Sequence, residues 1–185
     1  PLSSPGSLGS LGPEGIPIPS APALASTSSG ATGSDVDNIG CLGAEQTVFH
    51  IHAHLTIFVN GTPRQIPYAI GITNPQAQST AQGTFVGGGA GSCFYWLHTH
   101  AADGIIHIES PVHRTFTLGN LFDIWGQPLG PRQVGPASGP VTAIYNGKLY
   151  DGNPRNIPLN AHAQIQLGVG KPLIAPVSIT FPSGV

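Results

Sequence analysis

The stretch Phe49–Val59, FHIHAHLTIFV, alternates apolar residues with a second set rich in histidine and ends at Asn60-Gly61. Successive side chains of a strand point to opposite faces, so this period of two predicts one long β-strand with an apolar face and a histidine face. Asn-Gly favours tight hairpin turns, and a second such pair at 146–147 predicts another hairpin. The chain is therefore expected to build its core from β-sheet that carries a row of imidazoles.

Strand-like segments and turn signals alternate over the rest of residues 41–185. The 26 Gly and 19 Pro of the chain interrupt helices. One short helix is expected, starting near Thr117 or Asn120, and residues 74–92 are interpreted as a long polar, glycine-rich loop. We therefore expect an all-β domain, a β-sandwich or a barrel-like arrangement of short antiparallel strands, with at most one short helix.

Residues 1–40 are low-complexity Ser, Gly, Pro and Ala and predict an extended N-terminal arm ahead of the histidine-rich β domain of residues 41–185. The first residue, Pro1, is not Met, which indicates a processed or truncated form. Ordering such an arm costs about 1–2 kcal/mol per residue, so an ordered arm needs a partner. That partner is either the chain's own globular part or a neighbouring copy.

The segment 15–20, GIPIPS, alternates apolar residues with Pro and favours an edge strand or a polyproline segment lying in a groove. An arm that docks on the next copy gives head-to-tail association, which closes into rings or grows into filaments. Self-association through residues 1–40 is therefore the protein partner that we predict.

Charged residues make up only 8% of the chain and the net charge is -2. Without a basic patch, nucleic acid and anionic membrane surfaces are excluded as expected partners. No apolar run approaches the roughly 18 residues that a membrane-spanning helix needs. The composition therefore predicts neither nucleic-acid binding nor membrane insertion.

The two cysteines, Cys41 and Cys93, each lie just upstream of a histidine cluster. We expect them to form a disulfide that fixes the entries to two site strands, which implies an oxidising compartment. An extracellular or cell-surface location follows, with the periplasm as second choice. Two buried thiols, or a thiolate metal ligand, are the alternatives.

Six of the 8 histidines occur in two clusters, and they point to a metal site. A turn between two antiparallel strands would bring His98 and His100 near His107 across the ladder. Glu109 shares a face with His107 and is a fourth ligand or an acceptor for an imidazole N–H. The candidate metal ligands are His98, His100, His107, His52, His54, His50 and Glu109. One ion does not need so many donors, so either there are two sites or some histidines only support the ligands.

Other polar residues have simpler explanations. Asp103 is expected to cap the turn before Gly104 rather than bind metal. His113 is expected at the surface, and His162 to pack or hydrogen-bond, with ligation as the alternative. A histidine face that alternates by chance is the alternative for the HIHAH stretch.

The ligand types favour copper, with zinc second and iron, nickel or manganese behind. There is no Met, and the cysteines are expected to pair with each other, which removes the ligands of a blue-copper electron-transfer site. An all-nitrogen site suits copper(II) or zinc, and copper leads the affinity order for nitrogen donors.

Three blocks of the sequence together resemble a family of exported or membrane-anchored bacterial and archaeal proteins with no established activity. They are HIHAHLTIFVNG at 50–61, LHTHAADGIIHIESP at 97–111 and FTLGNLFDIWG at 116–126. The resemblance covers about residues 41–170 and implies export and a shared histidine site. The HxH pair also resembles cupins, but here His107 precedes Glu109, whereas in cupins the Glu follows soon after the pair.

These observations predict an extracellular metal-binding β-protein that assembles through its N-terminal arm into a surface filament or homopolymer. A mononuclear copper or zinc enzyme is the alternative, with His98, His100 and His107 holding the ion and Glu109 or Asp103 acting as acid or base. A soluble periplasmic metal carrier is the third. No catalytic residue is assigned, because the chain has no Ser-His-Asp motif, nucleotide-binding loop or CxxC pair.

Overall fold

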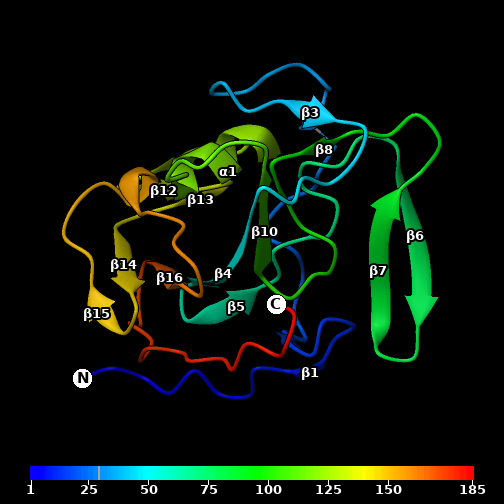
Figure 1. The fold of residues 1–185 in the computed structure, drawn as a ribbon. Coiled ribbons are helices and arrows are strands. Elements are labelled where there is room, and N and C mark those ends of the chain that lie inside the picture. Colours follow the sequence, from blue (N-terminus) through cyan, green and yellow to red (C-terminus); the bar gives the residue numbers. More distant parts are fainter. Residues whose placement is uncertain (29) are drawn as a thin grey trace.

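The computed structural model describes residues 1–28 and 30–185 (Figure 1). Strands dominate it, and the predicted all-β fold with one short helix is confirmed. The helices are α1 (Leu118–Trp125) and the one-turn 3₁₀ helix η1 (Pro154–Asn156). The strands of the main sheet are β4 (Phe49–Val59), β5 (Thr62–Arg64), β9 (Leu97–His98), β10 (Ile105–Ser110), β14 (Val141–Tyr145), β15 (Lys148–Leu149) and β16 (Gln164–Val169). The smaller sheets contain β1 (Ser10–Leu11), β2 (Pro17–Ile18), β3 (Cys41–Leu42), β6 (Pro75–Thr80), β7 (Gly83–Gly88), β8 (Phe94–Tyr95), β11 (Leu129–Gly130), β12 (Gln133–Val134) and β13 (Ala137–Ser138).

The central sheet has the order β15-β14-β16-β4-β10-β9, with β5 paired to β4. Both predicted Asn-Gly hairpins are present, β4–β5 and β14–β15. Asn60 and Gly61 have φ of 50° and 78°, and Asn146 and Gly147 have φ of 49° and 79°. Left-handed backbone at both positions is what a type I′ turn requires. One pair of the main sheet, β16 with β4, is parallel. Between these strands the chain passes through α1 and the β11–β13 sheet, a long connection of the kind that a parallel pair needs.

The apolar face of the sheet is covered by α1 (Figure 1). Ala53 and Ile57 of β4 and Ile106 and Ile108 of β10 have no exposed surface and belong to one apolar cluster with the helix. The helix starts where the sequence predicts, since the side chain of Thr117 accepts a hydrogen bond from the Asn120 backbone N–H. The histidine face of the same strands is thus left for other segments to cover.

The first forty residues contact the chain's own domain, one of the two partners that the sequence left open. Ser3 bonds on both sides, its N–H to Leu173 O and its O to the Ala175 N–H, each at 2.8 Å. Ile16 is fully buried in a small cluster with Ile105 at the start of β10. The two ends of the chain therefore run together along one side of the molecule (Figure 1).

Residues 74–92 differ from the sequence-based expectation. They contain a β-hairpin, β6–β7, rather than the predicted loop, so that prediction was wrong. The pattern was hidden because β6 is exposed along its whole length and carries no apolar face. Only β7 contributes to the interior, through Val86. Among the described residues, no helix is long and apolar enough to cross a membrane.

Candidate metal centre

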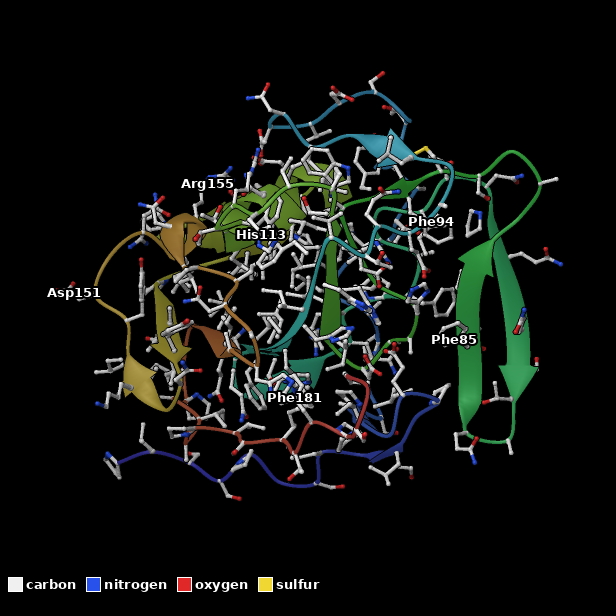
Figure 2. All side chains as sticks on the ribbon, viewed as in Figure 1. Phe85, Phe94, His113, Asp151, Arg155 and Phe181 are labelled. Carbon is white, nitrogen blue, oxygen red and sulfur yellow. A yellow bond between two sulfur atoms is a disulfide. The ribbon has the colours of Figure 1, made fainter. Side chains whose placement is uncertain are left out.

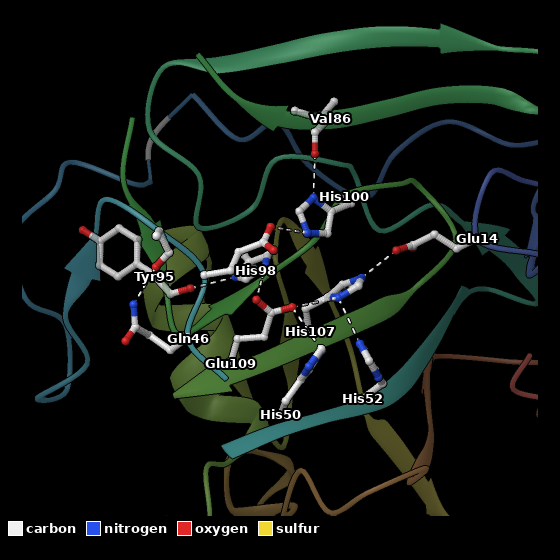
Figure 3. A network of polar contacts seen from close by, with 12 residues as sticks. Glu14, Gln46, His50, His52, Val86, Tyr95, His98, His100, His107 and Glu109 are labelled. Atoms are coloured by element: carbon white, nitrogen blue, oxygen red, sulfur yellow. Dashed lines mark hydrogen bonds and ion pairs between the residues drawn. The ribbon is translucent and has the colours of Figure 1, made fainter. Parts of the chain in front are cut away.

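The register of three neighbouring strands brings the predicted ligands together. His107 of β10 lies opposite His52 of β4 on one side and opposite His98 of β9 on the other. Glu109 lies opposite His50. The expectation that His98 and His107 meet across a ladder is thus fulfilled. The sequence did not indicate that β4 is the other neighbour of β10, which joins the two histidine clusters into one centre (Figure 3).

The first of two groups of possible ligands contains His50, His52, His107 and Glu109. His52 Nε2 lies 3.1 Å from His107 Nδ1, and Glu109 Oε1 lies 3.3 Å from His50 Nε2 and 3.4 Å from His107 Nδ1. Bonds of about 2.0–2.1 Å in a tetrahedral zinc site place neighbouring donor atoms about 3.3 Å apart. These side chains are therefore already spaced as the ligands of a small cation.

The second group contains His98, His100, His107 and Glu109, and its donor atoms lie within 4.8 Å of one another. His98 Nε2 is 3.9 Å from Glu109 Oε2. His100 Nε2 is 3.2 Å from Oε1 of Glu45, a residue of the loop after β3. The two groups thus share His107 and Glu109 and lie on opposite sides of β10 (Figure 3).

Backbone carbonyls fix the ring orientation of two imidazoles. Nδ1 of His98 donates to Tyr95 O at 2.8 Å, and Nδ1 of His100 donates to Val86 O at 2.6 Å. A carbonyl only accepts, so the N–H is on Nδ1 and the lone pair is on Nε2 in each neutral ring. His98 Nε2 is buried without a hydrogen-bond partner among the described residues. Both rings therefore offer Nε2 as a metal ligand.

Burial keeps most of these imidazoles neutral, as ligation requires. Desolvation, reinforced by the charge on His107, lowers the pKa of His98 to about 3 and that of His52 to about 4. His107 is the exception: burial alone would lower its pKa, but hydrogen bonds to Glu109 and Glu14 outweigh burial and raise the pKa to about 9. His107 is therefore the cation of the metal-free centre, held between two carboxylates.

Glu14 is a site residue that the sequence analysis missed. Its Oε1 accepts from His107 Nε2 at 2.6 Å, and its side chain is only 6% exposed. Burial and the nearby Glu14 charge raise the pKa of the Asp103 carboxyl well above its usual value. One signal was present in the sequence, because Glu14 is the only charged residue among the first 34.

Aromatic side chains cover the second group. The ring of Phe85 on β7 stacks on His100, with centroids 4.8 Å apart and planes 10° apart. Phe94 of β8 contacts His98 edge-on. Figure 2 labels both residues in the part of the molecule next to the β6–β7 hairpin, with Phe85 on the hairpin itself. The hairpin that the sequence did not predict therefore holds and shields one ligand.

The remaining candidates lie outside the two groups. His54 is a predicted ligand, but its Nε2 bonds to Asp103 O at 2.8 Å, and neither group includes it. Asp103 Oδ1 accepts from the Ile105 N–H, so Asp103 caps the turn as predicted. His113 is exposed beside Phe49, and His162 Nε2 donates to Val185 O, as expected for residues that pack or hydrogen-bond.

The predicted disulfide between Cys41 and Cys93 is present. It joins β3 to the segment that leads into β8, and the two strands also pair with each other. In the chain, Glu45 comes shortly after β3, and His98 comes shortly after Cys93. The disulfide thus ties the loop that carries Glu45 to the strand that carries His98.

Comparison with known proteins found no matching family model, no curated protein of similar sequence and no solved structure of similar fold. A buried set of imidazoles and carboxylates with lone pairs turned inward could bind a metal ion.

Proposed function

We propose that this protein is an extracellular metal-binding protein that takes copper in preference to zinc. The observation that carries the proposal is the convergence of five histidines and Glu109 from β4, β10 and the segment of β9 and the residues just after it. Nitrogen-rich donor sets suit both ions, and copper(II) has the higher affinity for them. Carboxylates beside the imidazoles offset the positive charge of a divalent ion.

The extracellular location is supported by the disulfide, because disulfides persist in oxidising compartments. The ligand types agree with copper(II), the form of copper that suits an oxidising compartment. The chain offers no free thiol or thioether ligand that would favour copper(I). The resemblance to exported proteins points the same way.

The test is metal analysis of protein purified without added metal, followed by competitive titration with Cu²⁺ and Zn²⁺. We expect tight binding of copper, and weaker binding when His107 is replaced in H107A. H113A is the matched control, since His113 lies outside both groups and should leave binding unchanged. Failure of the wild type to bind either ion would overturn the proposal.

We further propose that copies associate by exchanging residues 1–40 into a filament or homopolymer. The contacts that hold this segment are compatible with exchange: Ser3 pairs with Leu173 and Ala175, and Ile16 packs beside Ile105. A neighbouring copy presents the same partners. Light scattering and imaging of wild type and of S3C/I174C, in which oxidation locks the bridged positions within one chain, test this. A locked chain that still polymerises, or a wild type that stays monomeric, would refute exchange.

A copper or zinc enzyme remains the second candidate, because a surface hollow reaches the first group. His50 and His52 line this hollow together with His162 and the C-terminal residues Gly184 and Val185. An enzyme needs a coordination position open to solvent. Azide added to the copper-loaded protein should then produce a ligand-to-metal absorption band. An unchanged spectrum would favour a closed, structural or storage role.

A further inference from the structure

We propose that the centre is dinuclear: the two groups bind two metal ions at the same time, Glu109 bridges them, and Glu45 supplies a donor to the second ion. The inference rests on the proposed metal-binding function and adds the number of ions and their connection. It also assigns a role to Glu45, which no sequence motif marks as a metal ligand.

The first argument is how Glu109 uses its two oxygens. Oε1 lies near His50 Nε2 and His107 Nδ1, at 3.3 and 3.4 Å. Oε2 faces His98 Nε2 at 3.9 Å, on the other side of β10. A carboxylate whose oxygens serve separate donor sets is the bridge found where two metal ions lie about 3.5–4 Å apart.

The second argument is how His107 uses its two nitrogens. Nε2 bonds to Glu14 at 2.6 Å, so Nδ1 is the atom left for a metal ion. Nδ1 lies 3.1 Å from His52 Nε2, which places it with the first group. The first ion then has His50, His52, His107 and one oxygen of Glu109, a complete tetrahedral set.

The second ion needs another donor in place of His107, and Glu45 is the carboxylate that lies beside His100. Its Oε1 lies 3.2 Å from His100 Nε2. Because Nδ1 of His100 donates to Val86 O, Nε2 of the neutral ring carries a lone pair that faces a carboxylate oxygen. A proton or a metal ion between the two atoms would hold two acceptors at this distance. His98, His100, Glu45 and the second oxygen of Glu109 supply four donors to that cation.

Each ion also has its own contact with solvent. His50 in the first group and Glu45 in the second are each 43% exposed, whereas the Glu109 bridge is 4% exposed. Ions can therefore enter from the two sides of β10 without unfolding the core. The negative charges of Glu14, Glu45 and Glu109 partly offset the four positive charges of two divalent ions.

The exposed donors allow a test that leaves the core intact. Wild type, H50A, E45A and the control H113A are loaded with Cu²⁺, and bound copper is counted by titration and elemental analysis. We expect two ions per chain in wild type and in H113A. Loss of a direct donor should weaken one ion at least about tenfold in H50A and in E45A while the other stays tight, since even indirect partners contribute about 10–100-fold.

Electron paramagnetic resonance distinguishes a bridged pair from two separate ions. Wild type should give a dipole-coupled spectrum with a half-field signal, and each single-donor variant, loaded with one equivalent, the spectrum of an isolated Cu²⁺. One ion per chain that both H50A and E45A weaken would overturn the inference, as would two uncoupled ions. Both outcomes leave metal binding standing, whereas absence of copper from the wild type would refute the proposed function itself.

Discussion

At the scale of single residues, His107 determines how the centre is organised, because its ring nitrogens face different partners. Nε2 is bonded to Glu14, and Nδ1 faces His52 and Glu109. A carboxylate that accepts the far N–H of a ligating imidazole fixes the ring orientation and makes the ring a stronger donor. Glu14 therefore has a positioning role although it comes from a segment far from the histidine clusters.

Removal of this carboxylate should weaken metal binding. For E14A we expect a loss of about 10–100-fold in copper affinity, and a smaller loss for E14Q, whose amide oxygen still accepts from His107 Nε2. D35N is the matched control, an exposed acidic position in the same segment. The affinities are compared by competitive titration, and an E14A affinity equal to that of wild type would contradict the role.

The buried neutral histidines predict acid sensitivity of the metal-free protein. The pKa of His54 is about 4 and that of His98 about 3, both lowered chiefly by burial. Below pH 6.5 the unfolded chain takes up protons that the folded chain does not, so stability falls as the pH falls toward 4. Each of the two histidines contributes up to about 1.4 kcal/mol per pH unit over this range. Urea unfolding at pH 7, 6 and 5 measures the slope; a flat profile would be inconsistent with buried neutral imidazoles.

At the scale of elements, the centre depends on what lies beside β9 and β10. The Gly104 turn joins them, and a side chain at Gly104, whose φ is 86°, would collide with the backbone of Leu55 on β4. The disulfide then holds β3 against β8, so that the Glu45 loop lies over His100. Short strands such as β9, with two residues, are positioned by these connections rather than by their own pairing.

Loss of the disulfide should therefore affect both stability and the centre. The cysteines are 52 residues apart, and closure of a loop of that length is worth about 4 kcal/mol in the chain-entropy treatment. We expect C41S/C93S to lose about that much unfolding free energy in denaturant titration. It should also bind less copper at the position of the second ion, to which Glu45 is proposed to supply a donor. A double variant as stable as the wild type would show that packing alone holds β3.

At the scale of the whole molecule, the centre connects segments that are distant in the sequence. Its residues come from the N-terminal segment, the loop after β3, and strands β4, β9 and β10, while Phe85 from the β6–β7 hairpin covers it. The main apolar core lies on the opposite face of the sheet. A metal ion at the centre would therefore stabilise a part of the fold that buries mainly polar groups.

Metal binding should raise the melting temperature. A ligand at about 100 times its Kd adds about 2.7 kcal/mol, which for a chain of this size corresponds to about 5–10 °C. Calorimetry with and without Cu²⁺, and after removal of copper by a chelator, measures the shift. In H107A the shift should be smaller, because the first group loses a donor. An equal shift in H107A would place the stabilising ion elsewhere.

The parts of the fold that depend on neighbouring residues could be predicted from the sequence. The alternation in Phe49–Val59 predicted β4 and its two faces, the Asn-Gly pairs predicted both hairpins, and Thr117 marked the start of the helix. These features follow from local backbone preferences and from side-chain periodicity, which a single chain displays directly. The same reasoning placed His98, His100 and His107 together, because a short turn connects their strands.

Long-range packing sets which strand lies on the other side of β10 and which segments cover the histidine face. The pairing of β4 with β10 made one centre from two clusters. The N-terminal segment and the loop after β3 then added Glu14 and Glu45, neither of which belongs to a recognisable motif. The β6–β7 hairpin was likewise hidden, because β6 is exposed along its whole length and carries no apolar face. Pairings between distant segments depend on how the whole chain packs, and local sequence patterns do not encode that choice.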